Sequence, residues 1–238
     1  MLIDSHFHLE KYRNHKALYG EINELKQYSL CVTCTPGVFL SCLNLYPETK
    51  FIRFALGIHP IEIAEPQRCL FEFDHCFSKA KYIGEVGLDY GKGAPSRDSQ
   101  LMVFKHIVKK QAMSEKPMSI HCRGAENDMI DILSEFPGKK RIIHWYTGSS
   151  ECLTKLVTLG CYFSINTSMV SNNERAHALK SIPVERILVE SDGPYTRVNG
   201  KKYSPHLLKE AYAVIGSALC MPSLEKVVYH NFGEMLMQ

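Results

Sequence analysis

The chain opens with Met1-Leu2-Ile3-Asp4-Ser5-His6-Phe7-His8, an apolar stretch that ends in two histidines one residue apart. Its apolar start predicts a β-strand. Successive side chains of a strand point to opposite faces, so His6 and His8 project from the same face. Two imidazoles that converge on one point form half of a metal site, although an isolated His-x-His is more often a pair of ordinary polar residues. The rest of the chain decides between these two interpretations.

Short apolar runs recur along the whole sequence and alternate with segments of helical periodicity. The predicted strands cover residues 1–8, 30–35, 51–58, 82–89, 117–121, 141–144, 161–165 and 186–192. The predicted helices cover residues 16–28, 36–47, 66–80, 96–115, 126–136, 149–159, 174–181, 204–219 and 223–238. Eight strand–helix units without an internal repeat or a linker favour a closed α/β architecture, a (β/α)8 TIM-like barrel, over an open sheet. We therefore expect one domain over residues 1–238.

The composition is that of an ordinary globular protein, with 238 residues of which 45% are hydrophobic and 22% charged. A formal net charge of +3 permits nucleic-acid binding, but a dedicated sequence-independent binder has a stronger basic bias. We see no signal peptide before the first strand and no apolar run of membrane-spanning length. The sequence therefore predicts a cytoplasmic protein that does not bind a membrane.

The nine cysteines are an odd number and lack the regular pairing of a secreted, disulfide-rich protein. Most of them, such as Cys122 and Cys161, lie in apolar runs where a free cysteine behaves as a small hydrophobic residue. The one C-x-x-C motif, Cys31 to Cys34, lies in a predicted strand, where residues three apart face opposite sides. No second C-x-x-C is present to complete a zinc ribbon. We interpret this pair as structural.

The carboxyl ends of the predicted strands carry side chains that can ligate a metal. In a (β/α)8 barrel these strand ends form the active site. Five of the 11 histidines fall there, together with acidic residues, whereas a chance distribution would scatter them. The candidate side chains are His6, His8, His59, Glu85, Asp89, His121, His144 and Asp192.

Imidazoles and carboxylates together suit zinc or manganese, and magnesium where carboxylates and water dominate. The set exceeds what one catalytic ion with an open position needs. Two divalent ions, bridged by a carboxylate and a water, fit it better. Glu85 is the natural bridge because it ends a central strand. Such a bridging water can attack an electrophilic phosphorus or carbonyl carbon while the metals stabilise the developing charge.

The ordered motifs resemble the TatD family of metal-dependent deoxyribonucleases, within the amidohydrolase-like barrels, over nearly the whole chain. A closing Asn231-Phe232 also resembles the family pattern. The matching stretches are Ile3 to His8, Leu56-Gly57-Ile58-His59-Pro60, Ile83-Gly84-Glu85-Val86-Gly87-Leu88-Asp89-Tyr90, Gln100 to Phe104, Ile120-His121-Cys122-Arg123-Gly124-Ala125, His144 to Ser149, and Glu190-Ser191-Asp192-Gly193-Pro194-Tyr195.

The resemblance implies a role for each matching residue. His6 and His8 would hold one metal, and His121 and His144 the other. Glu85 would bridge the two ions. Asp192 would be a metal ligand that also accepts the nucleophile's proton, and His59 would lie beside the scissile phosphate. Arg123 would pair with a phosphate oxygen, and Tyr195 would contact the substrate.

Two departures from the family pattern put substrate preference in doubt more than metal chemistry. Gly193 stands where alanine is commoner, and the loop over residues 196–203 does not follow the usual spacing. The chain is also somewhat shorter than typical members. These differences resemble the divergent TatD-like proteins of bacterial anti-phage defence operons, of the QatD type. That resemblance implies a role in antiviral defence and operon-encoded partner proteins.

We therefore expect a metal-dependent nuclease that hydrolyses DNA, with single strands favoured and RNA as the other candidate substrate, and with 3′-to-5′ exonuclease action. Basic residues on the loops beyond the strand ends, Arg197, Lys201 and Lys202, are placed to meet phosphates, although they equally suit a solvated turn. A small-molecule amidohydrolase or phosphoesterase on the same barrel is the alternative, because a fold does not fix a function. A subunit that mainly binds partner proteins is a third hypothesis, against which the intact ligand set argues.

Overall fold

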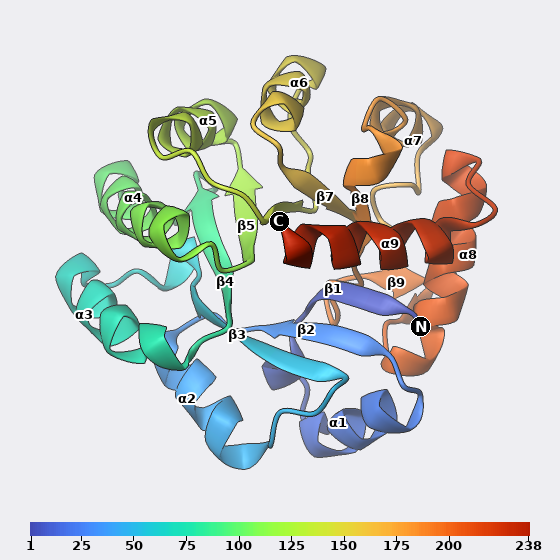
Figure 1. Ribbon diagram of the computed structural model, residues 1–238, viewed down its shortest axis with the longest axis horizontal. Coiled ribbons are helices and arrows are strands. Elements are labelled where there is room, and N and C mark those ends of the chain that lie inside the picture. Colours follow the sequence, from blue (N-terminus) through green and yellow to red (C-terminus); the bar gives the residue numbers. More distant parts are fainter.

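The computed structural model describes the backbone of residues 1–238 and the side chains of all of them except residues 173–175. Eight parallel strands form one sheet in chain order, and its edge strands β1 and β8 meet to make a nearly closed barrel (Figure 1). The strands are β1 (Ile3–Phe7), β2 (Tyr28–Val32), β3 (Ile52–Ile58), β4 (Tyr82–Asp89), β5 (Met118–Arg123), β6 (Arg141–His144), β7 (Tyr162–Ile165) and β8 (Ile187–Val189). The prediction of a single-domain (β/α)8 barrel is confirmed.

Each of the first seven strands is followed by the helix of the same number, and these helices lie around the barrel in Figure 1. Two further helices, α8 and α9, follow β8. The helices are α1 (His15–Glu24), α2 (Pro36–Leu45), α3 (Pro66–Cys76), α4 (Arg97–Ser114), α5 (Glu126–Glu135), α6 (Ser150–Thr158), α7 (Asn173–Leu179), α8 (Leu208–Leu219) and α9 (Leu224–Met237). No single helix among the described residues is long and apolar enough to cross a membrane. The bent pair Pro205–Leu219 and Leu224–Met237 reaches the required length and apolar composition only when its two helices are taken together.

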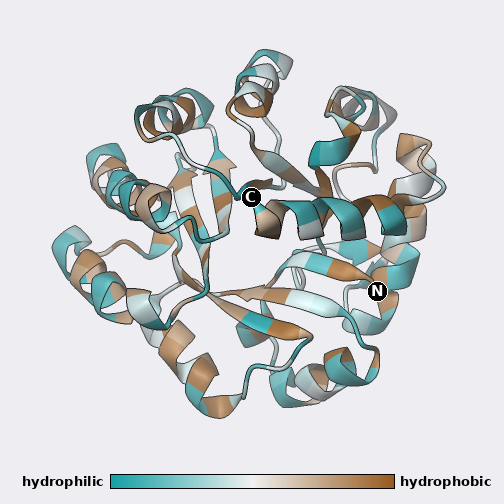
Figure 2. Ribbon diagram, in the orientation of Figure 1, coloured by the Kyte–Doolittle hydropathy of each residue, from teal (hydrophilic) through white to brown (hydrophobic). Residues whose placement is uncertain are grey.

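The strands are buried on both faces, because the helices cover the outside of the barrel and side chains fill its inside. This double burial explains why the strands have continuous apolar runs rather than an alternating pattern. The interior at the amino-terminal end contains Leu30, Val32, Ala55 and Tyr82, against which Leu236 of α9 packs. In Figure 2, α9 shows alternating hydrophilic and hydrophobic bands, as expected for a helix with one face on the barrel.

Helix α9 closes the amino-terminal end of the barrel, opposite to the strand ends that carry the histidines (Figure 1). The amide of Asn231 fixes it there by donating to the carbonyl oxygens of Val184 (2.7 Å) and Ile187 (2.8 Å) at the start of β8. Asn231 is only 3% exposed, so water cannot replace these bonds. The family-like Asn231-Phe232 pair is therefore structural, with Phe232 packed against Tyr28 at a ring separation of 5.2 Å.

Replacing Asn231 by leucine will lower the free energy of unfolding by about 2–3 kcal/mol, because two buried carbonyl groups lose their donor. Urea unfolding at equilibrium measures this change. The matched control is His230→Ala, which alters an exposed neighbour on the same helix and will change stability by less than about 0.5 kcal/mol. An Asn231→Leu protein as stable as the wild type would show that these bonds do not anchor α9.

A buried carboxylate joins the two edge strands of the barrel. Asp4 on β1 accepts hydrogen bonds from the backbone N–H (2.8 Å) and the hydroxyl (2.6 Å) of Ser191, and from the hydroxyl of Tyr203 (3.2 Å). The backbone N–H of Asp192 also donates to the carbonyl oxygen of His6 (2.9 Å). The seam between β1 and β8 therefore holds the first histidine motif and Asp192 in one fixed arrangement.

The predicted boundaries are wrong at several elements. Helix α1 ends at Glu24 rather than at Tyr28, because Lys26 adopts a left-handed conformation (φ 54°) that ends the helix. Strand β2 ends at Val32 rather than at Thr35, because Thr33 leaves β3 and forms backbone hydrogen bonds with Gly84 and Glu85 of β4.

Two corrections concern the segment around β8. This strand ends at Val189 instead of residue 192, because the following residues turn toward β1. The loop after Tyr195 contains a hairpin of two short strands, β9 (Arg197–Val198) and β10 (Lys201–Lys202). Asn199 (φ 47°) and Gly200 (φ 80°) form its turn, and positive φ at both positions is typical of a type I′ turn.

Candidate metal centre

A cavity of about 610 Å³ opens at the carboxyl ends of the strands. It is the place where the sequence predicts the active site. The imidazole of His6 lies fully buried beneath its floor. Asp89 lies behind His121, whose Nε2 is 3.0 Å from its Oδ2. The other predicted site residues line the cavity itself, namely His8, His59, Glu85, His121, Arg123, His144, Asp192 and Tyr195.

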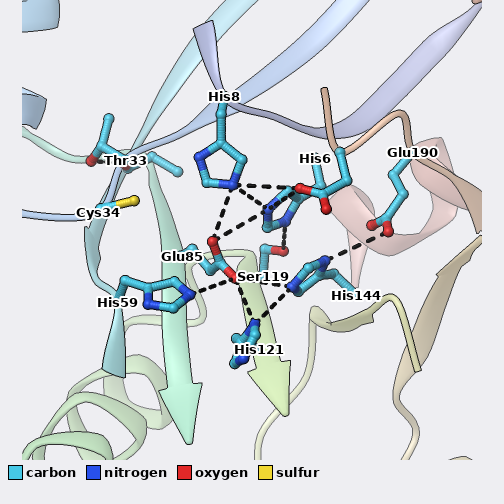
Figure 3. A network of polar contacts seen from close by, with 12 residues as sticks. His6, His8, Thr33, Cys34, His59, Glu85, Ser119, His121, His144 and Glu190 are labelled. Atoms are coloured by element: carbon cyan, nitrogen blue, oxygen red, sulfur yellow. Dashed lines mark hydrogen bonds and ion pairs between the residues drawn. The ribbon is translucent and has the colours of Figure 1, made fainter. Parts of the chain in front are cut away.

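Glu85 on β4 lies at the middle of the cluster, 2% exposed, with its two oxygens turned toward different histidines (Figure 3). Its Oε2 is 3.2 Å from Nε2 of His8 and 3.6 Å from Nε2 of His6. Its Oε1 is 2.9 Å from both Nδ1 of His121 and Nε2 of His144. One carboxylate therefore connects the two pairs of imidazoles that the sequence singled out.

The backbone around Glu85 depends on a close approach of three strands. The carbonyl oxygen of Thr33 accepts from the N–H of Glu85 (3.0 Å), although β3 lies between β2 and β4 in the sheet. Gly57 of β3 makes room for this bond, because a Cβ atom there would lie 1.9 Å from the Thr33 oxygen and 2.5 Å from the Glu85 nitrogen. Any side chain at residue 57 would displace Glu85 from the cluster.

Asp192 completes the corner of the cluster beside His6 and His8. Its Oδ1 lies 3.7 Å from Nε2 of His6 and 3.5 Å from Nε2 of His8, and those two ring nitrogens are 3.2 Å apart. This buried oxygen has no hydrogen-bond partner in the described part of the chain. Such an atom is costly to bury unless something else satisfies it.

The imidazoles of His6, His8, His121 and His144 each turn one ring nitrogen toward Glu85 and the other toward an oxygen outside the cluster. The outer contacts are Nδ1 of His6 with Oγ of Ser119 (2.8 Å), Nδ1 of His8 with Oε1 of Glu10 (3.2 Å) and Nε2 of His121 with Oδ2 of Asp89 (3.0 Å). Nδ1 of His144 faces Oε1 of Glu190 at 3.5 Å, without a hydrogen bond among the described residues. Outer partners of this kind orient metal-binding histidines and fix their tautomers. The inner nitrogens are thereby left free to bind a cation.

The cluster fits a divalent cation by its donors as well as by its shape. Three groups, His6 with Glu85 and His144, His6 with His8 and Asp192, and His59 with Glu85 and His121, each offer ligand atoms within 4.8 Å of one another. Imidazole nitrogen and carboxylate oxygen are ligands of Zn²⁺ and Mn²⁺. The unpartnered oxygen of Asp192 points into the same space. The residues present could therefore hold a divalent metal.

Burial and charge set the protonation of the metal-free cluster. Burial lowers the pKa of His6 to about 3, so its ring is neutral. Burial also opposes a charge on the other three rings. For His8 a hydrogen bond with Cys34, and for all three rings hydrogen bonds to carboxylates and the charge of Glu85, outweigh it. The pKa values of His8 and His144 therefore lie well above 6.5, and that of His121 is raised.

Metal binding will release protons and will strengthen as the pH rises. A raised histidine pKa means that the free site holds protons at neutral pH, and an arriving cation must displace them. We expect affinity to increase about tenfold per pH unit for each proton released. Titration calorimetry with Mn²⁺ at two pH values, in buffers of different ionisation enthalpy, measures both quantities. Affinity that is independent of pH, with no proton release, would contradict this account of the cluster.

Three further predicted residues lie around the cluster at the cavity. His59 places Nε2 3.4 Å from Oε1 of Glu85, while its Nδ1 accepts from the backbone N–H of Ile61 (3.2 Å). Arg123, at the end of β5, and Tyr195, 58% exposed, line the cavity, and the Tyr195 ring lies edge-on to His8 at 5.5 Å.

Sequence reasoning missed several residues that contribute to the site. Of the C-x-x-C pair interpreted as structural, Cys31 belongs to the hydrophobic core, whereas Cys34 is buried at the lining of the cavity. Glu10 and Ser119 support histidines but end no strand, and only the three-dimensional pairing reveals them. Lys11 and Trp145 also line the cavity. Trp145 directly follows His144 and Lys11 lies three positions after His8, so closeness in sequence to a predicted ligand is the signal that could have indicated them.

Comparisons with known proteins agree with this geometry. The family model described as TatD related DNase matches residues 3–236. A protein of Buchnera aphidicola (subspecies Baizongia pistaciae) named "Uncharacterized metal-dependent hydrolase" is 31% identical over 209 residues, which cover 82% of this chain and 78% of that protein. The Schizosaccharomyces pombe protein named "Deoxyribonuclease Tat-D" is 29% identical over 70% of this chain and 59% of its own length.

A human protein and a bacterial crystal structure extend the comparison. The human "3'-5' RNA nuclease TATDN2" is 30% identical over 81% of this chain, which corresponds to 28% of that protein. The crystal structure of YJJV, a TatD homologue of Escherichia coli, superimposes with a TM-score of 0.83 at 16% identity and covers 98% of this chain and 97% of that one. Since the family model spans almost every residue, the chain belongs to the TatD-related DNase family of metal-dependent hydrolases.

Proposed function

We propose that this chain is a nuclease that hydrolyses phosphodiester bonds of DNA at a centre of two divalent ions, Mg²⁺, Mn²⁺ or Zn²⁺. One observation carries the proposal: Oε2 of Glu85 faces His6 and His8, while its Oε1 faces His121 and His144. A single carboxylate turned toward two separate pairs of imidazoles is the arrangement expected of a bridging ligand. Asp192 adds an oxygen to the first pair.

The surrounding residues have distinct tasks in hydrolysis. Bound in this cluster, divalent ions would lower the pKa of water and stabilise negative charge on the phosphate. Oδ1 of Asp192, buried and without a hydrogen-bond partner in the described part of the chain, is placed to accept a proton from the attacking water. His59 keeps its Nδ1 as an acceptor for the Ile61 N–H, so Nε2 carries the proton and can donate it toward a phosphate or leaving oxygen.

The depth of the cluster supports action on a single strand. The side chains of His6 and Glu85 are almost completely buried at the floor of the cavity. A phosphodiester bond must enter the cavity to reach them, which a flexible strand can do and a rigid duplex cannot. Trp145 and Tyr195 line the same cavity and offer aromatic faces on which bases can stack. Lys11 and Arg123 add positive charge for phosphates.

The names of the relatives support nucleic acid as the substrate class and leave two candidates within it. One relative is named a deoxyribonuclease and another a 3′-5′ RNA nuclease. We propose 3′-to-5′ cleavage of single-stranded DNA as the activity, with single-stranded RNA as the second substrate to compare.

Oligonucleotides labelled at the 5′ end test the proposal directly. Incubation of single-stranded DNA, single-stranded RNA and duplex DNA with Mg²⁺, Mn²⁺ or Zn²⁺ will yield a ladder that shortens from the 3′ end, fastest for single-stranded DNA. Chelation of the metal will stop it. A parallel panel of small phosphate esters, carboxylic esters and amides tests the alternative substrates. If the small molecules of that panel are hydrolysed while the oligonucleotides remain uncut, the nuclease assignment is overturned.

Replacing Arg123 by alanine will raise the KM for an oligonucleotide about tenfold with little change in kcat, because the guanidinium binds phosphate before and during the reaction alike. Steady-state kinetics measures the two constants separately. Arg123→Lys will recover part of the affinity, since it keeps the charge and loses the planar fork. The control Lys79→Ala removes an exposed charge before β4, at the opposite end of the barrel. An unchanged KM in Arg123→Ala would exclude a phosphate contact.

We place the protein in the cytoplasm and propose a role in antiviral defence with operon-encoded partners. All nine cysteines are free thiols in this structure, which suits a reducing compartment. The defence role is tested by plating phage on two strains. One strain expresses the wild-type protein together with the products of its neighbouring genes, and the other expresses the same genes with Glu85→Ala in this protein. Equal plaque numbers in the two strains would exclude a catalytic role in defence.

A further inference from the structure

Cys34 is held at the edge of the metal centre by the backbone on both of its sides. The preceding residue, Thr33, bonds with Gly84 and Glu85 of β4, and the carbonyl oxygen of Cys34 accepts from the N–H of His59 (2.9 Å). Cys34 is 6% exposed and lines the cavity. Figure 3 shows its sulfur directed toward His8 and Glu85. Its position is therefore fixed by the same strand ends that fix the cluster.

The sulfur completes a fourth possible set of metal ligands. Sγ of Cys34, a ring nitrogen of His8 and a carboxylate oxygen of Glu85 all lie within 4.8 Å of one another. Ligands that surround one ion at about 2.0–2.3 Å lie up to about 4.6 Å apart, close to this limit, so a small movement of the side chains would let all three bind a single ion. A second, independent observation points to a ligand in the same corner: the buried Oδ1 of Asp192, 3.5 Å from Nε2 of His8, has no hydrogen-bond partner among the described residues.

We propose that Cys34 is a thiolate ligand at the His8 side of the metal centre and that it biases this position toward thiophilic ions such as Zn²⁺ and Co²⁺ over Mg²⁺. The inference rests on the metal centre of the proposed function. Soft thiolate sulfur favours Zn²⁺, whereas Mg²⁺ prefers hard oxygen ligands. On binding, the S–H bond breaks, a sulfur–metal bond forms and the proton passes to the solvent.

The competing explanation is that Cys34 only fills space and donates weakly to Glu10, whose Oε1 lies 3.7 Å from Sγ. The two explanations differ in a spectroscopic property. Co²⁺ bound by nitrogen and oxygen alone has weak visible bands, whereas a thiolate ligand adds an intense sulfur-to-cobalt charge-transfer band in the near ultraviolet. This band reports on the ligand itself and requires no enzymatic activity.

The experiment is a titration of the purified metal-free protein with Co²⁺, followed by absorption. The wild type will develop visible bands together with the charge-transfer band, and Cys34→Ser and Cys34→Ala will keep the visible bands and lose the charge-transfer band. Cys220→Ser is the matched control, because it removes an exposed thiol at the end of α8. The same variants will bind Zn²⁺ at least about tenfold more weakly, with an unchanged affinity for Mg²⁺.

The outcomes separate this inference from the proposed function. Visible bands without a charge-transfer band in the wild type would overturn the role of Cys34 and leave the metal centre intact. A charge-transfer band that persists in both Cys34 variants would overturn it as well. Failure of the wild type to bind Co²⁺, Zn²⁺ or Mn²⁺ at all would overturn the metal centre and the inference together. Circular dichroism of each variant confirms that it is folded.

Discussion

Replacing Glu85 by alanine will reduce the rate of oligonucleotide hydrolysis by about 10³- to 10⁵-fold, the factor that corresponds to several kcal/mol of lost transition-state stabilisation. The oxygens of Glu85 contact both pairs of imidazoles, at 3.2 Å and 3.6 Å on one side and 2.9 Å twice on the other. Its removal separates the two halves of the centre and takes away a buried negative charge that favours cation binding.

Glu85→Gln tests the role of the charge alone, because glutamine keeps the shape of the side chain and removes only its negative charge. We expect nearly the same loss of activity, together with fewer bound metal ions per chain by elemental analysis. Circular dichroism and thermal unfolding show whether each variant remains folded. Degradation that survives in a folded Glu85→Ala protein would show that the cluster is not the catalytic site.

Replacing Asp192 by asparagine will lower kcat by about 10²- to 10⁴-fold, the range for loss of a general base, with little change in KM. Asparagine keeps an oxygen near Nε2 of His8 but cannot accept a proton at neutral pH. Burial raises the pKa of the Asp192 carboxyl to about 7 in the metal-free cluster, so this group can exchange a proton near physiological pH.

Metal content and kinetics together isolate the role of Asp192. We expect Asp192→Asn to retain bound metal, in contrast to Glu85→Ala, while turnover is lost. The control Asp74→Asn alters a partly exposed carboxylate on α3 that pairs with Lys110, and it will change kcat by less than about twofold. Full activity in Asp192→Asn would assign proton acceptance to another group.

The barrel and the position of its site could be predicted because the signals are local. Short apolar runs alternate with helical segments, and five histidines and Glu85 lie on or directly after those runs. Once the strands are parallel, their carboxyl ends meet at one end of the barrel. The sequence therefore predicts that the five histidines gather at this end of the barrel, and in the structure the rings of His6 and His144 stack there at 4.0 Å.

The position of Cys34 in the cavity could not be predicted from the sequence, because it depends on the residue at which strand β2 ends. The alternation of a strand places residues 31 and 34 on opposite faces only if the strand continues through both. Strand β2 ends at Val32, and Thr33 crosses Gly57 to bond with β4, which turns Cys34 into the cavity. This crossing requires three strands in register, and one strand's sequence does not contain that information.

The hairpin after Tyr195 differs from Cys34, because the sequence does contain an indication of its turn. Asn199-Gly200 is a strong sequence indication of a type I′ turn, but each flanking strand is only two residues long. Two-residue strands have no measurable periodicity. The partners of the histidines, such as Glu190, held by Ser164 and Asn166, come from several strands and emerge only from the assembled barrel.

The most direct test of the two-metal centre is anomalous diffraction from crystals grown with Mn²⁺. The proposed centre of two ions predicts two anomalous peaks per chain on opposite sides of the Glu85 carboxylate, one beside His6 and His8 and the other beside His121 and His144. A single peak, or peaks away from Glu85, would contradict the bridging role assigned to this residue.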